Sequence, residues 1–180
     1  MIKKLRKIST AEKYSNPWWK YNIDRYEMPD GHEGDYHYVH SSGSTFIIPI
    51  TDEGNFFLVK QFRYLNQKES LEFPGGGIKR GLTPAENAVE ELREEAGLLS
   101  EKIIYLGSFN PFNGVTDEIC NVYLAESVKS VGNSPEPSEE FDIVELTFSE
   151  LINKIAKGEI WDGMTLTAWS LYIYSEHLQK

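Results

Sequence analysis

The sequence lacks the features that mark secreted and membrane proteins. It has a single cysteine, Cys120, among 180 residues, so no disulfide can form within the chain. No window of the sequence approaches the roughly 18 consecutive apolar residues of a membrane-spanning helix. The basic start MIKKLRK is not followed by the apolar run of a signal peptide. We therefore expect a cytoplasmic protein with no membrane partner, and we expect Cys120 to be a core thiol.

Basic residues are also scarce. The chain has 18 Lys and Arg against 28 Asp and Glu, which gives a net charge of -10. Binding to a nucleic-acid backbone requires a surplus of Lys and Arg, so the composition argues against nucleic acid as a partner. The content of 40% hydrophobic and 26% charged residues is ordinary for a globular protein. The length allows one domain with a substantial core and argues against a second full domain.

Several segments have the pattern of regular secondary structure. The aromatic-rich runs WWKYNIDRYEM and DYHYVH, on either side of PDGHEG, predict a β-hairpin that precedes the main domain. Further strands are predicted at STFIIPI, NFFLVKQFRY, KIIYLGSF, EICNVYLA and FDIVELTF. Two late helices are predicted at SELINKIAKG and TLTAWSLYIYSEHL.

The clearest helix signals begin at Thr83. This residue can cap the helix together with Glu86 in a capping box, and Pro84 suits the first helical position. Gly97 suits the C-terminal cap. An apolar stripe follows helical spacing through Ala85, Ala88, Val89, Leu92 and Ala96. We expect the helix to pack by this stripe and to expose its carboxylates on the other side.

Those carboxylates form a dense cluster, because Glu90, Glu91, Glu94 and Glu95 lie within six residues. Like charges one helical turn apart cost only a few tenths of a kcal/mol on an exposed helix, and Arg93 offsets part of the repulsion. A charge-rich helix face is more often solvated surface than a binding site. The cluster alone therefore does not indicate a function.

The glycine loop before the helix changes this interpretation. The glycines at positions 75–77 permit a close approach of the backbone, so a peptide carbonyl can face the carboxylates. Oxygen ligands without cysteine or paired histidines favour Mg²⁺ or Mn²⁺ over Zn²⁺. The pattern predicts a divalent-metal site at which Glu91, Glu94 and Glu95 converge.

The stretch from Gly76 to Leu98 resembles the Nudix box, GX5EX7REUXEEXGU, where U is a large aliphatic residue. The matching positions are Glu91, Leu92, Glu94, Glu95, Gly97 and Leu98. Two positions differ: Leu82 stands at the first Glu and Glu90 at the Arg. In the family those two residues commonly support the metal-binding helix, so the orientation of the ligands in this chain depends on other contacts.

The resemblance extends over roughly residues 44 to 178. The phrases LVKQFRY, SLEFPGG, LGSFNPFNGVTDE and GEIWDGMTLTAW are similar to the Nudix branch that hydrolyses ADP-ribose and related nucleoside diphosphate sugars. The resemblance implies an α/β/α sandwich with a mixed β-sheet in residues 44–180, with the Nudix box at 76–98. Residues 1–43 are similar to the N-terminal β extension that this branch uses for homodimerisation.

The resemblance also implies an activity, which is metal-dependent hydrolysis of a pyrophosphate bond in a nucleoside diphosphate derivative. Glu91 and Glu95 are then carboxylate ligands, Glu94 is a further ligand or catalytic orienter, and the carbonyl of Gly75 is a backbone ligand. A glutamate in a later loop acts in this branch as base or ligand. The candidates are Glu139 and Glu140 in PSEEFDI, and the sequence does not choose between them.

Each candidate substrate contact has two interpretations that the sequence leaves open. Arg63 can bind phosphate or form a structural ion pair with Glu72. The aromatic residues Trp18, Trp19 and Phe112 can stack on a base or sugar, although aromatic residues in strands more often belong to a core or a dimer interface.

The alternative to an enzyme is a Nudix-fold regulatory protein that binds nucleotides with little turnover. The departures at Leu82 and Glu90 motivate it, since a fold does not guarantee its chemistry.

Overall fold

The computed structural model describes residues 4–131 and 142–175. They form two compact units. The first unit comprises Met1–Gly43 and Asn110–Ile119, and the second comprises Ser44–Phe109 and Cys120–Lys180. Each unit is described by itself below.

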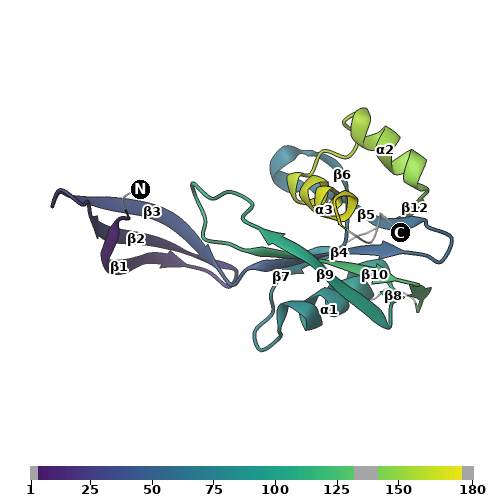
Figure 1. Ribbon diagram of the computed structural model, residues 1–180, viewed down its shortest axis with the longest axis horizontal. Helices are drawn as coiled ribbons and strands as arrows, with labels where there is room; N and C mark the ends of the chain where they lie inside the picture. Colours follow the sequence, from purple (N-terminus) through teal and green to yellow (C-terminus); the bar gives the residue numbers. More distant parts are fainter. Residues whose placement is uncertain (1–3, 132–141, 176–180) are drawn as a thin grey trace. The chain divides into compact units, whose positions relative to one another are not determined.

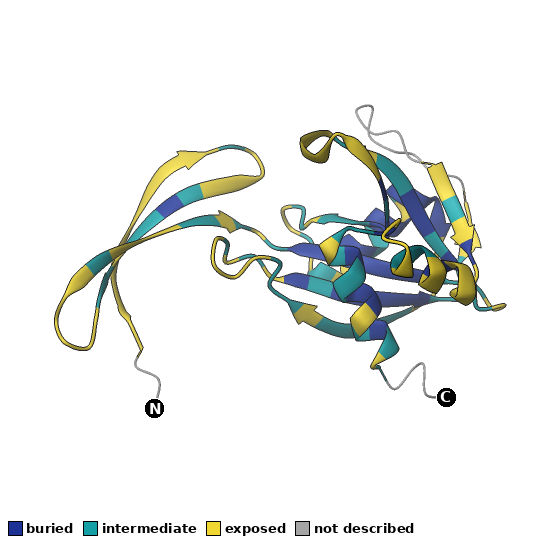
Figure 2. Ribbon diagram, turned by 90° about the horizontal axis from the view of Figure 1, so that it is seen from above, coloured by how far each residue is buried: buried dark blue, intermediate teal, exposed yellow. Residues whose placement is uncertain are grey.

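The first unit is built on a three-stranded antiparallel sheet in the order β1-β2-β3 (Figure 1). Its strands are β1 (Arg6–Ser15), β2 (Trp19–Glu27) and β3 (Glu33–Ser41). The predicted hairpin is the pair β2 and β3, and β1 is an additional strand that the polar run RKISTAEKYS did not indicate. Asn22 is the one buried residue of these strands, so the sheet has almost no core of its own (Figure 2).

The segment Asn110–Ile119 belongs to the first unit through backbone hydrogen bonds to β3. The Val39 N–H donates to the Val115 carbonyl at 2.8 Å, and the Asp117 N–H donates to the Val39 carbonyl at 3.2 Å. This segment therefore continues the sheet at its β3 edge.

The second unit contains a seven-stranded mixed sheet with β12-β5-β4-β10-β9 as its main path. These strands are β12 (Asp142–Leu146), β5 (Phe56–Arg63), β4 (Ser44–Ile50), β10 (Cys120–Glu126) and β9 (Lys102–Phe109). β6 (Lys68–Glu72) pairs with β5, and β7 (Gly75–Gly77) pairs with β4. β4 and β10 are parallel and the other pairs are antiparallel. A 3-10 turn, η1 (Tyr64–Asn66), and a small sheet of β8 (Leu98–Leu99) and β11 (Lys129–Ser130) complete the strands.

Helices cover both faces of this sheet (Figure 1). α1 (Pro84–Ala96) lies on one face, and α2 (Phe148–Ala156) and α3 (Gly163–Ile173) lie on the other. Because neighbouring strand residues point to opposite faces, Ile47 packs in a cluster with Leu92 of α1, while Ile48 packs with Trp169 of α3. The predicted α/β/α sandwich with a mixed sheet is confirmed. Cys120 is fully buried, as a core thiol should be.

The sequence predictions for α1 hold at both ends. The Thr83 hydroxyl accepts from the Glu86 N–H at 3.3 Å, and the Glu86 carboxylate accepts from the Thr83 N–H at 2.8 Å. Pro84 is the first helical residue, and Gly97 ends the helix with a φ of 63°. No helix among residues 4–131 and 142–175 combines the length and apolar character needed to cross a membrane.

Candidate functional site

The three glycines before α1 form the short strand β7 and not the loop that the sequence suggested. A Cβ on Gly75 would lie 2.4 Å from the Thr45 carbonyl oxygen and 2.6 Å from the Phe46 ring. A Cβ on Gly76 would lie 2.9 Å from Oε1 of Glu91. Gly75 and Gly76 are therefore needed for close approach, as expected, but it is the approach of β7 to both β4 and α1 that requires them.

Two of the predicted site carboxylates are buried, which corrects the expected exposed face of α1. Glu91 and Glu95 are each 7% exposed, whereas Ala85 of the predicted apolar stripe is exposed. The reason is geometric: positions 87, 91 and 95 form one row on the helix, and α1 packs with this row toward the main sheet. Backbone and side-chain N–H donors take the place of water around these two carboxylates, because a buried charge requires hydrogen-bond partners.

The partners of these two carboxylates differ. Oε2 of Glu95 accepts from the backbone N–H of Gly75 at 2.9 Å, so the amide of Gly75 is the group in contact with this side chain. Oε1 of Glu91 accepts from the side-chain amide of Asn87 at 3.4 Å. Strand β7 thus contacts Glu95, and α1 itself contacts Glu91 through Asn87.

Asn87 is a site residue that the sequence analysis missed. It is fully buried, its amide donates to Oγ1 of Thr45 at 2.9 Å, and its Oδ1 accepts from the backbone N–H of Lys79 at 2.9 Å. It therefore ties α1 to β4 and to the turn that precedes the helix. The only signal in the sequence was an amide side chain one turn before Glu91.

Lys79 reaches the same cluster from that turn. Its ammonium group donates a hydrogen bond to Oε2 of Glu94 and lies 3.9 Å from Oε1 of Glu91. Two carboxylates of α1, three residues apart, thus share one positive charge. Hard oxygen donors arranged around a cation are the chemistry that Mg²⁺ and Mn²⁺ prefer, so Glu91 and Glu94 fit such an ion.

The carboxylates do not, however, converge on one point by themselves. In the described parts of the chain, no group of three or more His, Cys, Asp or Glu side chains is arranged to hold a metal ion. Glu91, Glu94 and Glu95 are brought into one region, where Asn87, Lys79 and Gly75 contact them.

The residues at the two unusual Nudix-box positions, Leu82 and Glu90, form other contacts in the structure. Glu90 accepts a hydrogen bond from Arg93 at 2.6 Å on the exposed part of α1. Leu82 is half-buried, and its N–H donates to the Lys79 carbonyl at 3.1 Å. The side chain of Asn87, which accepts from the Lys79 N–H, links the turn before α1 to the helix.

Arg63 and Glu72 form an ion pair beside the site. Arg63 donates through Nε to Oε1 of Glu72 at 2.7 Å and through Nη2 to Oε2, while Glu72 is 1% exposed. The hydrogen bonds to Glu72 raise the pKa of Arg63, and Glu95 adds a smaller electrostatic contribution in the same direction. This ion pair therefore neutralises a buried carboxylate near Glu95.

The predicted aromatic contacts all lie in the first unit, in exposed positions. Trp18, Trp19 and Phe112 are 78%, 40% and 64% exposed. The Trp19 ring packs against Tyr14 at a centroid distance of 5.6 Å. Glu139 and Glu140 lie outside the described residues.

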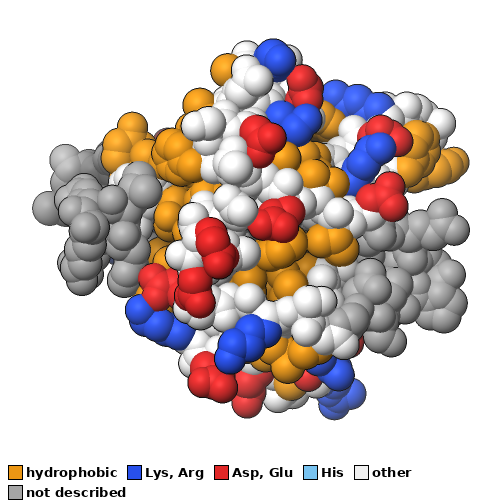
Figure 3. All heavy atoms as spheres, turned by 90° about the vertical axis from the view of Figure 1, so that its right-hand side faces the viewer, with side chains coloured by type: hydrophobic (Ala, Val, Ile, Leu, Met, Phe, Trp, Pro, Cys, Tyr) orange, Lys and Arg blue, Asp and Glu red, His pale blue; other side chains and the backbone are white. Residues whose placement is uncertain are grey.

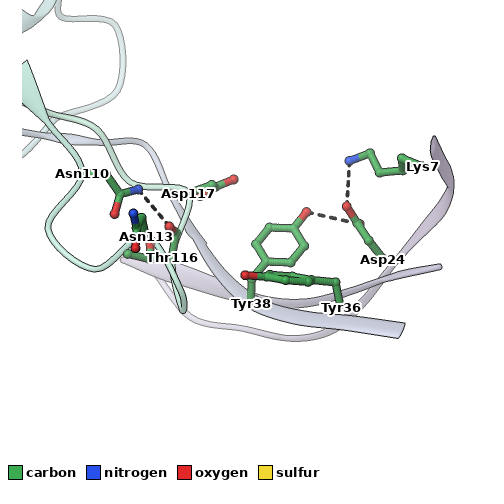
Figure 4. Close-up of a pocket in the computed structure, with 8 residues that line it drawn as sticks. All are labelled: Lys7, Asp24, Tyr36, Tyr38, Asn110, Asn113, Thr116 and Asp117. Carbon is green, nitrogen blue, oxygen red and sulfur yellow. Dashed lines mark hydrogen bonds and ion pairs between the residues drawn. The ribbon is translucent and has the colours of Figure 1, made fainter. Parts of the chain in front are cut away.

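An open pocket of about 380 Å³ lies within the first unit (Figure 4). Its lining residues are Lys7, Asp24, Tyr36, Tyr38, Asn110, Asn113, Thr116 and Asp117. Lys7 pairs with Asp24 at 3.0 Å, and the Tyr38 hydroxyl donates to the same carboxylate at 3.4 Å. Lys7 and Asp24 thus satisfy each other, Asp117 pairs with His40 at 2.8 Å, and the lining does not include the glutamates of α1.

Comparisons with known proteins agree with this architecture. The sequence profile of the NUDIX domain matches residues 40–167. The chain is 31% identical over 163 residues to a methanol dehydrogenase activator of Bacillus methanolicus, covering 89% of this chain and 88% of that protein. It is 29% identical over 159 residues to an ADP-ribose pyrophosphatase of Bacillus subtilis (strain 168), covering 87% and 86%. A crystal structure of an ADP compounds hydrolase shares the fold, with a TM-score of 0.81, 16% identity, and coverage of 96% and 94%.

Proposed function

Because the chain belongs to the NUDIX domain family and is a Nudix-type pyrophosphohydrolase, we propose that its substrate is ADP-ribose or a nucleoside diphosphate sugar and that hydrolysis requires Mg²⁺ or Mn²⁺. The observation that carries this proposal is the buried row of Glu91 and Glu95 beside β7, with Glu94 next to it. The 29% identity to an ADP-ribose pyrophosphatase supports the substrate class.

The proposed reaction is a hydrolysis at phosphorus. A water oxygen forms a bond to one phosphorus of the diphosphate, the bond from that phosphorus to the bridging oxygen breaks, and a carboxylate accepts the water proton. ADP-ribose would yield AMP and ribose 5-phosphate. Either Glu139 or Glu140 remains the proposed proton acceptor.

The chain's own residues prepare the site for this reaction. Glu91 and Glu95 are fixed by Asn87 and by the Gly75 amide, so little rotamer freedom remains to be lost on binding. A divalent ion bound by Glu91, Glu94 and Glu95, with a carbonyl oxygen of Gly75, would neutralise phosphate oxygens and acidify water. Arg63, Trp18, Trp19 and Phe112 remain candidate substrate contacts.

The electrostatics of the protein support a cation in this role. The net charge is -10, and the face drawn in Figure 3 shows exposed acidic side chains interspersed with Lys and Arg. A diphosphate is repelled by such a protein at long range. A bridging cation removes that repulsion where carboxylates and phosphates must meet.

The test is AMP release from ADP-ribose, with Mg²⁺ or Mn²⁺ and with excess chelator. We expect turnover that depends on the metal and falls by about 100-fold or more in Glu95→Gln, the range for loss of a group that orients catalytic charge. Glu90→Gln is the matched control on the same helix, because Glu90 is engaged with Arg93 on the exposed side. Turnover of nucleoside triphosphates in preference to ADP-ribose would contradict the substrate class.

A second candidate function is regulation of another enzyme by a Nudix-fold protein with weak turnover. It is supported by the 31% identity to a protein named as an activator of methanol dehydrogenase, and by Leu82 and Glu90 in the box. Calorimetry with ADP-ribose separates the two functions. Tight binding without metal-dependent AMP release would favour the regulator.

We further propose that the protein is a homodimer that uses residues 1–43. The support is the sheet β1-β2-β3, which exposes Tyr14 and Trp18 and buries little of itself. A small sheet needs a covered apolar face for stability.

A further inference from the structure

We propose that the ammonium group of Lys79 is a built-in counter-ion of the carboxylate site, which holds Glu91 and Glu94 in place until a divalent cation displaces it. This inference rests on the proposed function, since it concerns the same carboxylates. It adds a residue that neither the Nudix-box pattern nor the sequence analysis assigned to the site. It also makes metal binding an exchange of one cation for another.

The position of Lys79 is fixed by the helix that carries the glutamates. Its backbone N–H donates to Oδ1 of the fully buried Asn87 at 2.9 Å. Its carbonyl accepts from the Leu82 N–H at 3.1 Å, which closes the turn before α1. The side chain therefore starts from an anchored point, and its ammonium group reaches α1 one and two turns beyond Asn87.

The contacts of the ammonium group distinguish it from an ordinary surface ion pair. It donates to Glu94 and lies 3.9 Å from Glu91, so two carboxylates share one positive charge. Lys154, on α2, is comparably exposed but pairs with the single carboxylate of Glu159 at 2.7 Å. Glu91 is almost completely buried, and a buried carboxylate requires a compensating charge.

The same geometry permits exchange. The Lys79 side chain is 40% exposed, so it can leave toward solvent without unfolding the turn that holds its backbone. A divalent ion and the ammonium group cannot share the same oxygens of Glu91 and Glu94, because like charges at that separation repel. A divalent ion that takes these oxygens therefore breaks the contacts of Lys79.

This exchange predicts that removing the lysine strengthens metal binding. We expect Lys79→Met to bind Mn²⁺ about two- to fivefold more tightly than the wild-type protein, because breaking an ion pair between partly exposed side chains costs a free energy that corresponds to this range. Lys79→Arg keeps the charge and should stay near the wild-type affinity. Lys154→Met is the matched control, because it removes a lysine–glutamate pair away from the site.

The measurement is the dissociation constant for Mn²⁺ from the electron paramagnetic resonance signal of the free ion, with the substrate-free full-length protein. A larger rise in melting temperature on adding Mn²⁺ to Lys79→Met is a second readout, since a ligand stabilises the folded state according to its affinity. Lys79→Gln tests the same sign if the methionine variant folds poorly.

The outcomes separate this proposal from the proposed function. An unchanged or weaker Mn²⁺ affinity in Lys79→Met and Lys79→Gln, with metal-dependent ADP-ribose hydrolysis intact, overturns the counter-ion alone. No Mn²⁺ binding by any of the proteins overturns both. Tighter binding in the two neutral variants, with no hydrolysis of ADP-ribose, supports the counter-ion and rejects the activity.

Discussion

At the residue scale, the three consecutive glycines of β7 are not equivalent. A Cβ added to Gly76 meets the Glu91 carboxylate at 2.9–3.0 Å, while a Cβ added to Gly77 meets nothing within 4 Å. Glycine at position 76 therefore makes room for a proposed ligand, whereas glycine at position 77 has no such steric reason. This difference provides a matched pair of variants.

We predict that Gly76→Ala lowers kcat/KM for ADP-ribose by at least about tenfold, because a displacement of the Glu91 carboxylate disturbs a site in which small misplacements have large effects. The overpacking should also destabilise the protein by about 1–3 kcal/mol. Gly77→Ala should retain wild-type activity within about twofold, given the open space around it. Steady-state kinetics and urea denaturation measure both quantities. Equal activity of the two alanine variants would contradict a role for Glu91 orientation.

The residue types of the site were readable from the sequence, but their burial was not. Helical spacing correctly grouped Glu91 and Glu95 on one face. The sequence analysis assigned that face to solvent, because hydrophobic periodicity does not show that the Gly75 amide lies beside it and donates to Glu95. Asn87 was missed for the same reason: its three partners come from α1, β4 and a turn, which only the folded chain brings together.

At the element scale, α1 and α2 begin with the same N-terminal capping motif. Thr83 and Glu86 form a capping box on α1, and Thr147 and Glu150 form one on α2. In each case the hydrogen bond from the threonine backbone N–H lowers the pKa of the glutamate below its usual value, with a further contribution from the threonine hydroxyl. The two helices can therefore be compared directly.

We predict that Thr83→Ala destabilises the protein by about 1 kcal/mol, the usual cost of losing a helix cap. The depressed pKa of Glu86 adds a pH dependence: its contribution is fully present above the ordinary glutamate pKa of about 4.3 and disappears as the pH falls through the lower folded-state value. Glu86→Gln should therefore lose part of the stability difference between pH 7 and pH 3. Thermal melts across that range measure it, and a pH profile identical to wild type would contradict the cap contribution.

Elements with strong local signals, including the apolar strands β4, β9 and β10, were predicted well, and strands without an apolar pattern were not. Thr83, Pro84 and Gly97 specified the ends of α1 from adjacent residues alone. Strand β7 consists only of glycine, which has a low strand propensity, and it exists because β4 lies beside it. Strand β1 is entirely exposed, so no hydrophobic alternation indicated it.

At the scale of the whole molecule, the division into units does not follow the chain order alone. The sequence suggested a boundary at residue 43, and the first unit does contain the residues up to Gly43. It also includes Asn110–Ile119, which the sequence analysis assigned to the main domain. The backbone pairing of Val39 with Val115 and Asp117 joins residues more than seventy positions apart, and no local pattern indicates such a pairing.

The proposed homodimer gives the prediction that belongs to this scale. In the first unit, Tyr14 is 57% exposed and Trp18 is 78% exposed, and these are large side chains that the proposed interface would cover. We predict that the wild-type protein has twice the chain mass of 20.6 kDa in light scattering after size exclusion. Trp18→Glu should shift it toward the monomer, because a charge in an apolar interface is desolvated without a partner. Tyr174→Glu is the control, since Tyr174 is 81% exposed in the second unit and should leave the mass unchanged. A wild-type monomer at micromolar concentration would falsify the dimer, and equal dissociation by both variants would assign the effect to added charge instead of to the first unit.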